Sequence, residues 1–303
     1  MKPRANIISC FFNHTKSNVL VENLKAFHES LGKYKDILKI IECVPLGGQS
    51  ELGGVGSVLT VHSNSVLWQK ERLLNIALDR LDSSVDTVIW CDTDLEFENP
   101  DWVSVVCEAL GDADVLQPFA SVVQKPALGE PALPSFSTCV VKNPELADQR
   151  FHAHGHTGYA WAIKREVIEK AGFFDECIMG GADHVMAHAF TGTPKSDCIA
   201  PLLGENSALN RRFVQWAARL LDGRDKLKLG SISQTVHHRR HGSQQGRMYI
   251  GRNRLMDQIG FDPERHLKRN LWNCWEWTES AQAQRQLATE YFDQRQEDQT
   301  TVT

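Results

Sequence analysis

The amino-acid sequence predicts an α/β protein built on a parallel sheet with helices on its faces. Two observations support this prediction. Apolar strand-like runs alternate with amphipathic helix-like stretches through the first half of the chain. Two aspartates then follow the third apolar run directly, in the segment VIWCDTDLEF. Strand, helix, strand, helix, strand is the order of a Rossmann-like parallel sheet, and such sheets bind ligands beyond the C-terminal ends of their strands.

The first half alternates regularly. We expect in turn a strand over Ile7–Phe12, a helix over about Val19–Leu31, a strand over Ile37–Val44, a helix that carries Leu67, Leu74, Leu78 and Leu81, and a strand over Thr87–Cys91. The Gly-rich segment PLGGQSELGGVGS separates the second strand from the second helix.

The second half is less regular. Its Pro-rich stretch Gln117–Pro144 predicts strands and long loops rather than helices. We expect helices over Lys164–Ala171, Gly181–Phe190 and Asn210–Leu221, and a last strand over Ser231–His238. The chain then reads as one domain over residues 1–277, with a ligand-binding half at 1–116 and a second half at 117–277. A polar helix and a frayed tail are expected at 278–303.

The composition is that of an ordinary globular protein, with 42% hydrophobic and 23% charged residues among 303. No stretch approaches the roughly 20 apolar residues that cross a bilayer, and the N-terminus runs into a strand pattern rather than a signal peptide. The eight cysteines are scattered without a C-x-x-C pair, as in a reducing compartment. We therefore expect a cytoplasmic protein.

The candidate site begins at Asp92 and Asp94. Buried carboxylates need a cation, and a divalent ion on the diphosphate of a nucleotide suits this place. Successive side chains of an extended strand alternate in direction, so both aspartates reach one ion only if the chain turns or if one acts through water. The alternative is that both simply cap a turn before Asn99 and Pro100. No G-x-x-x-x-G-K-[ST] loop is present.

These residues resemble the GT-A glycosyltransferases. The resemblance spans roughly residues 5–260 and rests on WQKERLLNIAL, VIWCDTDLEFENPDW, HGHTGYAWAIKREVIEKAGFFDECIMGGADH and HHRRHG. It implies that Asp92 and Asp94 hold Mn²⁺ or Mg²⁺ on a nucleoside diphosphate sugar, with Asp92 also facing the donor. It also implies transfer of that sugar to an acceptor hydroxyl.

The segment Gly180-Gly181-Ala182-Asp183 resembles the Gly-Gly-Glu-Asp motif of inverting galactosyltransferases, with Ala182 in place of the glutamate. The resemblance implies that Asp183 is the catalytic base. Its alternative is an N-cap of the following helix. An inverting mechanism follows if Asp183 is the base, although a retaining enzyme would not need one.

Further candidates follow from the resemblance. A late histidine, His238 or His241, is expected as another metal ligand, with His237 the weakest of the three; a solvated basic face is the alternative. Lys70 and Arg72 are candidates for the donor diphosphate, or ordinary residues of an exposed helix. Asn13 and Glu42 are candidates for the base and ribose, or turn residues. Trp161 is either a wall under a sugar or a core residue.

The acceptor has one signal. Residues 211–270 hold 14 Lys and Arg against 5 Asp and Glu in a chain of net charge −5. Basic residues interleaved with aromatics suit a polyanion with stackable bases, which suggests a hydroxymethylated base in DNA as the acceptor. The alternative acceptor is a saccharide or a lipid-linked sugar, which the breadth of the resembled family favours. Two other classes of protein remain as alternatives, namely a nucleotide-sugar-binding protein without catalysis and a nucleotidyltransferase. The residues concerned are Arg239, Arg240, Arg247, Arg252, Arg254, Lys268, Arg269, Trp272, Trp275 and Trp277.

Overall fold

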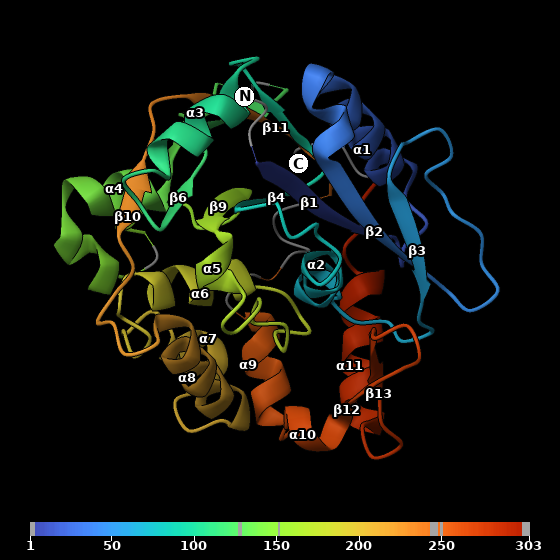
Figure 1. Ribbon diagram of the computed structural model, residues 1–303. Helices are drawn as coiled ribbons and strands as arrows, with labels where there is room; N and C mark the ends of the chain where they lie inside the picture. The colour runs from blue at the N-terminus through green and yellow to red at the C-terminus, as the bar shows by residue number, and fades with distance from the viewer. Residues whose placement is uncertain (1–3, 127–128, 151, 243–247, 249–250, 299–303) are drawn as a thin grey trace.

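A seven-stranded sheet forms the centre of the protein in a computed structural model (Figure 1). The structure describes residues 4–126, 129–150, 152–242, 248 and 251–298. The strand order is β10-β6-β9-β4-β1-β2-β3. These strands are β1 (Ala5–Phe12), β2 (Leu38–Val44), β3 (Val58–His62), β4 (Thr87–Cys91), β6 (Val115–Gln117), β9 (Ala160–Lys164) and β10 (Leu229–Ser231).

Most neighbours in this sheet are parallel. β1 pairs in parallel with both β2 and β4, and β2 pairs in parallel with β3. Only β9 runs antiparallel to its neighbours β4 and β6. The predicted α/β class with a parallel sheet and flanking helices is confirmed.

Helices cover both faces because side chains alternate along each buried strand. Ile7 and Ile89 belong to the core under α1 and α3, whereas Ile8 and Trp90 belong to the core under α2, α6 and α8. Figure 1 shows α1 and α3 on one side of the sheet and α2, α5, α6 and α8 below it. The helices are α1 (Asn18–Ser30), α2 (Lys70–Leu78), α3 (Trp102–Ala109), α4 (Phe136–Lys142), α5 (Arg165–Ile168), α6 (Ala182–Phe190), α7 (Ala200–Leu203), α8 (Ala208–Leu221), α9 (Gly251–Gln258), α10 (Pro263–His266) and α11 (Gln282–Asp293).

A second sheet, of order β5-β11-β7-β8, positions the candidate site. β11 pairs antiparallel with β5 so that His238 lies opposite Leu95, the residue after Asp94. This register brings a histidine from late in the chain to the carboxyl end of β4. The strands are β5 (Leu95–Phe97), β7 (Ser121–Lys125), β8 (Leu133–Pro134) and β11 (Thr235–Arg239), with a separate pair β12 (Leu267–Arg269) and β13 (Trp275–Trp277).

Several sequence-based expectations are wrong in the second half. A helix, α4, lies within the Pro-rich stretch 117–144, begun by Ser135, whose hydroxyl accepts from the Thr138 amide. The strand expected over Ser231–His238 is two strands, β10 and β11, in different sheets. The helix expected over Lys164–Ala171 is present but shorter, as α5 at Arg165–Ile168, and Lys164 ends β9. The sequence pattern does not predict β3 or β9.

The tail also differs from expectation. Arg295 and Glu297 are buried, and Asp298 accepts hydrogen bonds from the Ser17 hydroxyl and the Val19 amide at the start of α1. Arg295, Glu297 and Asp298 therefore pack against the rest of the protein, and residues 299–303 lie outside the described part. Among the described residues, no helix is long and apolar enough to cross a membrane.

Candidate active site

The chain turns directly after β4 and separates the two aspartates. The Asp92 amide donates to the Tyr159 carbonyl oxygen (2.8 Å), which ties this turn to the chain entering β9. Asp94 is buried, whereas Asp92 is half-buried. Their carboxylates enter two different groups of side chains, one with histidines and one with a lysine.

Asp94, His238 and His241 form the first group. One carboxylate oxygen of Asp94, Oδ2, lies 3.1 Å from His238 Nε2 and 3.0 Å from His241 Nε2. Ligand atoms of the three side chains all lie within 4.8 Å of one another. The other carboxylate oxygen, Oδ1, is buried with no hydrogen-bond partner among the described residues. A carboxylate and two imidazoles that converge in this way are a donor set for a transition-metal ion.

Polar partners contact both imidazoles at Nδ1, the ring nitrogen that does not face Asp94. Nδ1 of His238 lies 2.6 Å from Gln124 Oε1, and Nδ1 of His241 lies 2.6 Å from Glu297 Oε2. Because each partner atom is an acceptor, each Nδ1 donates to it, and Nε2 is the nitrogen that each ring would offer to an ion. Burial acts to raise the pKa of Glu297, but His241 and Arg295 bring that pKa down to about 2.

Lys70, Asp92 and Asp183 form the second group. The Lys70 ammonium, almost fully buried at the start of α2, lies 2.6 Å from Asp92 Oδ1 and 2.8 Å from Asp183 Oδ2. Burial acts to lower the pKa of Lys70, but Asp183 and Asp92 raise it well above its usual value. Burial raises the pKa of Asp92, against the attraction of Lys70. The lysine thus joins the strand end that carries Asp92 to the helix that carries Asp183.

The two glycines before α6 allow Asp183 to reach this group. Gly180 and Gly181 have φ values of +84° and +94°, a region that disfavours residues with a Cβ. Gly181 is the N-cap, without a side-chain capping bond, and Asp183 lies in the first turn. Its carboxylate is therefore turned to Lys70 instead of serving as the N-cap.

Asp94 has a markedly shifted acidity. Burial acts to raise its pKa, but the attraction of His238 and the hydrogen bonds from His238 and His241 hold the pKa of Asp94 well below its usual range. An ionised, buried carboxylate is thus held between two imidazoles. Such a perturbed acid at a strand end is typical of functional sites.

Glu71, the neighbour of Lys70, is buried, and burial raises its pKa from 4.5 to about 8. A carboxyl group with a raised folded-state pKa stabilises the fold below about pH 4.5, and this contribution is lost as pH rises through about 8. Glutamine does not titrate, so we expect the free energy of unfolding of Glu71→Gln to depend less on pH. Between pH 4.5 and about pH 8, the free energy of unfolding of this variant should rise by a few kcal/mol relative to that of the wild type, because one pKa unit corresponds to about 1.4 kcal/mol. Denaturant unfolding at a series of pH values measures this, with exposed Glu22→Gln as control. Parallel pH profiles for wild type and Glu71→Gln would contradict the assignment.

The remaining sequence candidates lie around the site in different roles. Arg72 is buried in an ion pair with Asp175 (2.8 Å) and does not join Lys70. The helix start that carries both residues is buried, not exposed. His237 faces Glu98 at 2.7 Å and is outside the Asp94 group.

The two strand-end candidates for the nucleotide, Asn13 and Glu42, are both buried. The Asn13 side chain closes a turn, accepting from the Ser17 amide and donating to Glu51. Glu42 lies within β2 and accepts from the Glu51 amide at 2.7 Å. Both thus meet at Glu51, a residue that the sequence does not single out.

Trp161 is a core residue. It is 1% exposed, stacks on Trp90, and donates its indole N–H to the Thr157 carbonyl oxygen. The aromatic residue at the site is Tyr159, whose φ of +79° is unusual for a residue with a side chain. Its ring packs 5.0 Å from that of His238, and its hydroxyl accepts from Gln124.

The basic segment is occupied in part by internal contacts, whereas Arg254, Lys268 and Arg269 are exposed. Arg239 pairs with Glu96, Arg240 pairs with Glu130, and Arg252 is buried. Trp275 and Trp277 are buried too, whereas Trp272 is 38% exposed. Arg247 lies outside the described residues. The arrangement therefore gives a DNA acceptor no support.

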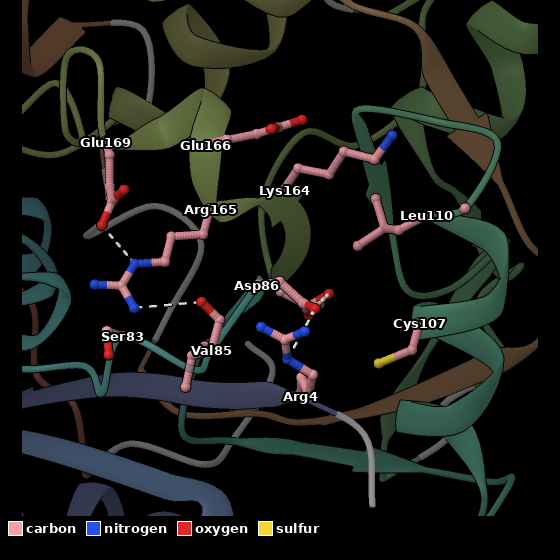
Figure 2. A pocket seen from close by; sticks show the side chains of 12 residues that line it. Arg4, Ser83, Val85, Asp86, Cys107, Leu110, Lys164, Arg165, Glu166 and Glu169 are labelled. Carbon is pink, nitrogen blue, oxygen red and sulfur yellow. Dashed lines mark hydrogen bonds and ion pairs between the residues drawn. The ribbon is translucent and has the colours of Figure 1, made fainter. Parts of the chain in front are cut away.

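A cavity of about 610 Å³ lies at the opposite end of β4 (Figure 2). Arg4 and Asp86, which form an ion pair there, flank the beginnings of β1 and β4. Asp92, Asp94 and Asp183 do not line it. Since ligands of such sheets bind at the carboxyl ends of the strands, we do not place the candidate site in this cavity.

Comparison with known proteins gives structural similarity only. No protein-family model and no curated protein sequence matches the chain. The chain is similar in structure to a mannosyltransferase, PcManGT from Pyrobaculum calidifontis, in complex with GDP-Man and Mn²⁺ (TM-score 0.40, 17% identity, 63% of this chain and 53% of that one). The similar structures are glycosyltransferases.

Two further solved structures are also similar to the chain, with different TM-scores. Glucosyl-3-phosphoglycerate synthase from Mycobacterium tuberculosis has a TM-score of 0.45 at 13% identity, over 90% of this chain and 86% of that one. The catalytic domain of Drosophila β1,4-galactosyltransferase 7, in complex with xylobiose, has a TM-score of 0.34 at 11% identity, over 60% and 58%. The chain thus spans just over half the length of the mannosyltransferase and of the galactosyltransferase.

Proposed function

We propose that this protein is a metal-dependent glycosyltransferase that moves a sugar from a nucleoside diphosphate sugar to an acceptor hydroxyl. The observation that carries the proposal is the pairing of two groups at the carboxyl end of β4. Asp94, His238 and His241 offer a metal-ligand set, and Asp92 and Asp183 meet on Lys70 beside it. A turn-capping function of the aspartates would not require histidines from the end of β11 or a lysine from α2.

The residues fit a divalent ion. The unpartnered oxygen of Asp94 is an orphaned buried acceptor among the described residues, and its burial is costly without a cation. Two imidazole nitrogens favour Mn²⁺ over Mg²⁺, which prefers oxygen ligands. Asp94, His238 and His241 would hold the ion. When bound, it would supply positive charge against the departing diphosphate.

The other group supplies the acid–base chemistry. Lys70 orients the Asp183 carboxylate through the 2.8 Å contact, and Asp183 takes the proton of the acceptor hydroxyl as this attacks the anomeric carbon. Asp92, on the other side of Lys70, contacts the donor. A single displacement of this kind inverts the anomeric carbon. NMR of the product from a donor of known anomeric configuration tests the inversion, and retention would exclude Asp183 as the base.

The acceptor we propose is a saccharide. The Asp183 side chain, which is 20% exposed, suits a neutral hydroxyl compound better than a polyanion. A non-catalytic nucleotide-sugar-binding protein is the second candidate, because the metal group alone would serve binding. Release of nucleoside diphosphate from a panel of nucleotide sugars, with Mn²⁺ and saccharide acceptors, separates the two. Binding without turnover would favour the second.

Glu297, whose carboxylate contacts His241 Nδ1, gives a test in which metal binding should weaken without being abolished. Glu297→Gln removes the charge that orients the imidazole, and such changes typically weaken metal binding by about 10- to 100-fold. Titration with Mn²⁺ followed by electron paramagnetic resonance measures the affinity. Glu290→Gln, at an exposed position of α11, is the control and should match the wild type. Equal affinity in Glu297→Gln would exclude His241 as a ligand.

A further inference from the structure

A second cluster of metal-ligating side chains lies outside the candidate active site. It consists of His154, His184, His188 and Cys198, whose ligand atoms all lie within 4.8 Å of one another. His154 and His188 are fully buried, His184 is nearly so, and Cys198 is half-buried. No C-x-x-C pair marks this cluster in the sequence, although His184 and His188 have the H-x₃-H spacing that is common among zinc ligands.

The three imidazoles present the same nitrogen to the cluster. Nε2 of His184 lies 3.0 Å from the Cys198 Sγ, and Nε2 of His154 lies 3.4 Å from it. Nε2 of His188 is buried with no hydrogen-bond partner among the described residues. Around a tetrahedral zinc ion with its usual bond lengths, neighbouring nitrogen and sulfur ligands lie roughly 3.3–3.6 Å apart. The His154–Cys198 distance is close to this, and the His184–Cys198 distance is shorter.

The opposite nitrogens of two of the rings face oxygen atoms. Nδ1 of His154 donates to the Gly155 carbonyl oxygen at 3.0 Å. Nδ1 of His188 lies 3.1 Å from the Ser196 hydroxyl and 3.2 Å from that of Thr193. The carbonyl acceptor leaves Nε2 of neutral His154 unprotonated, and a hydroxyl that accepts from Nδ1 does the same for His188; metal-binding histidines are commonly held in this way.

The surroundings of the three rings are buried. The Phe136 ring packs against both His154 and His188, with centroids 5.1 and 5.7 Å apart. Neutral imidazoles and a thiolate are the ligand forms that zinc takes.

We propose that His154, His184, His188 and Cys198 form a structural zinc site. Three nitrogens and one sulfur match the tetrahedral N/S preference of Zn²⁺, and four protein ligands close the site, as in structural rather than catalytic centres. His184 and His188 stand one turn apart on one face of α6. The ion would tie this helix to the segments that carry His154 and Cys198.

The location gives the site a consequence for the rest of the protein. Asp183 directly precedes His184 in the first turn of α6. Zinc at this cluster would therefore fix the helix end that presents Asp183. The proposal itself does not depend on the reaction, and its test uses metal content and spectra instead of activity.

The experiment measures zinc by mass spectrometry in full-length protein purified with a histidine-free tag and zinc supplementation. We expect about one zinc ion per chain, as for a closed four-ligand site, and its loss in His188→Gln and Cys198→Ser. His62→Gln and Cys107→Ser are matched controls that should retain it. His238→Ala should also retain it, which separates this zinc from any ion at the Asp94 group. Substoichiometric zinc in the wild type, or unchanged zinc in both cluster variants, would overturn the proposal.

Cobalt substitution decides the matter if the variants do not fold. Wild-type protein stripped with a chelator and loaded with Co²⁺ should show the intense visible bands of a four-coordinate ion and a sulfur-to-cobalt charge-transfer band. A weak, six-coordinate spectrum without the charge-transfer band would contradict the ligand set. Removal of zinc should also lower the melting temperature, because the ion binds only the folded site.

Discussion

Asp94→Asn should abolish metal-dependent sugar transfer, with a loss of roughly 10³-fold or more in kcat/KM. Asp94 supplies the carboxylate of the group that it forms with His238 and His241. An amide in its place keeps the shape but removes the charge that holds the ion. The ion's support of a leaving diphosphate is worth several kcal/mol, and each 1.4 kcal/mol or so corresponds to a factor of ten in rate. Steady-state kinetics over a range of Mn²⁺ concentrations measure the effect.

Asp112→Asn is the control for charge loss at an exposed site. It should keep wild-type kinetics. The Asp94→Asn variant should remain folded by circular dichroism and should lose its response to Mn²⁺. Wild-type activity in this variant, or activity that still rises with Mn²⁺ as in the wild type, would remove Asp94 from the metal site.

Asp183→Asn should lower kcat by about 10²- to 10⁴-fold, the usual contribution of a positioned general base. The metal group is intact in this variant, so binding of the nucleotide with Mn²⁺ should stay within a few-fold of the wild type. Turnover assays and calorimetric titration with the nucleoside diphosphate together give the two values. This separation of chemistry from donor binding distinguishes Asp183 from Asp94.

A purely structural function of Asp183 would give a different pattern. Loss of its ion pair with Lys70 would then lower stability and donor binding along with the rate. Unfolding midpoints of wild type, Asp183→Asn and Asp112→Asn provide the check. Full activity in Asp183→Asn would exclude it as the base and reopen the possibility of a retaining mechanism.

The first half of the fold is predictable because its signals are local. Each of β1, α1, β2 and β4 starts and ends within two residues of the apolar or amphipathic pattern that predicts it. β3 is harder to predict because a long Gly-rich loop, residues 45–57, connects it to its partner β2 with no intervening helix. In the second half the strands are short, and the break between β10 and β11 depends on which sheet each one joins. That information is not in the periodicity of the segment.

The residues of the candidate site also differ in how well the sequence predicts them. Asp94, Asp183, His238 and His241 stand in recognisable short motifs, and the structure brings each into one of the two groups. Glu297 has no such motif, and it reaches His241 from 56 residues along the chain. The tail that carries it is polar in composition and reads as disordered from sequence alone. Tertiary contacts give these residues their place: Asp298 binds the start of α1, and Glu297 contacts His241 and the Gly242 amide.

Thermal unfolding with nucleotide sugars tests the central claim most directly. A ligand that binds only the folded protein raises its melting temperature. We predict that at least one nucleoside diphosphate sugar raises the melting temperature of the wild type with Mn²⁺ present, that omission of Mn²⁺ removes most of the shift, and that Asp94→Asn shows none. If no nucleotide sugar stabilises the wild type in the presence of Mn²⁺, the proposed glycosyltransferase function is wrong.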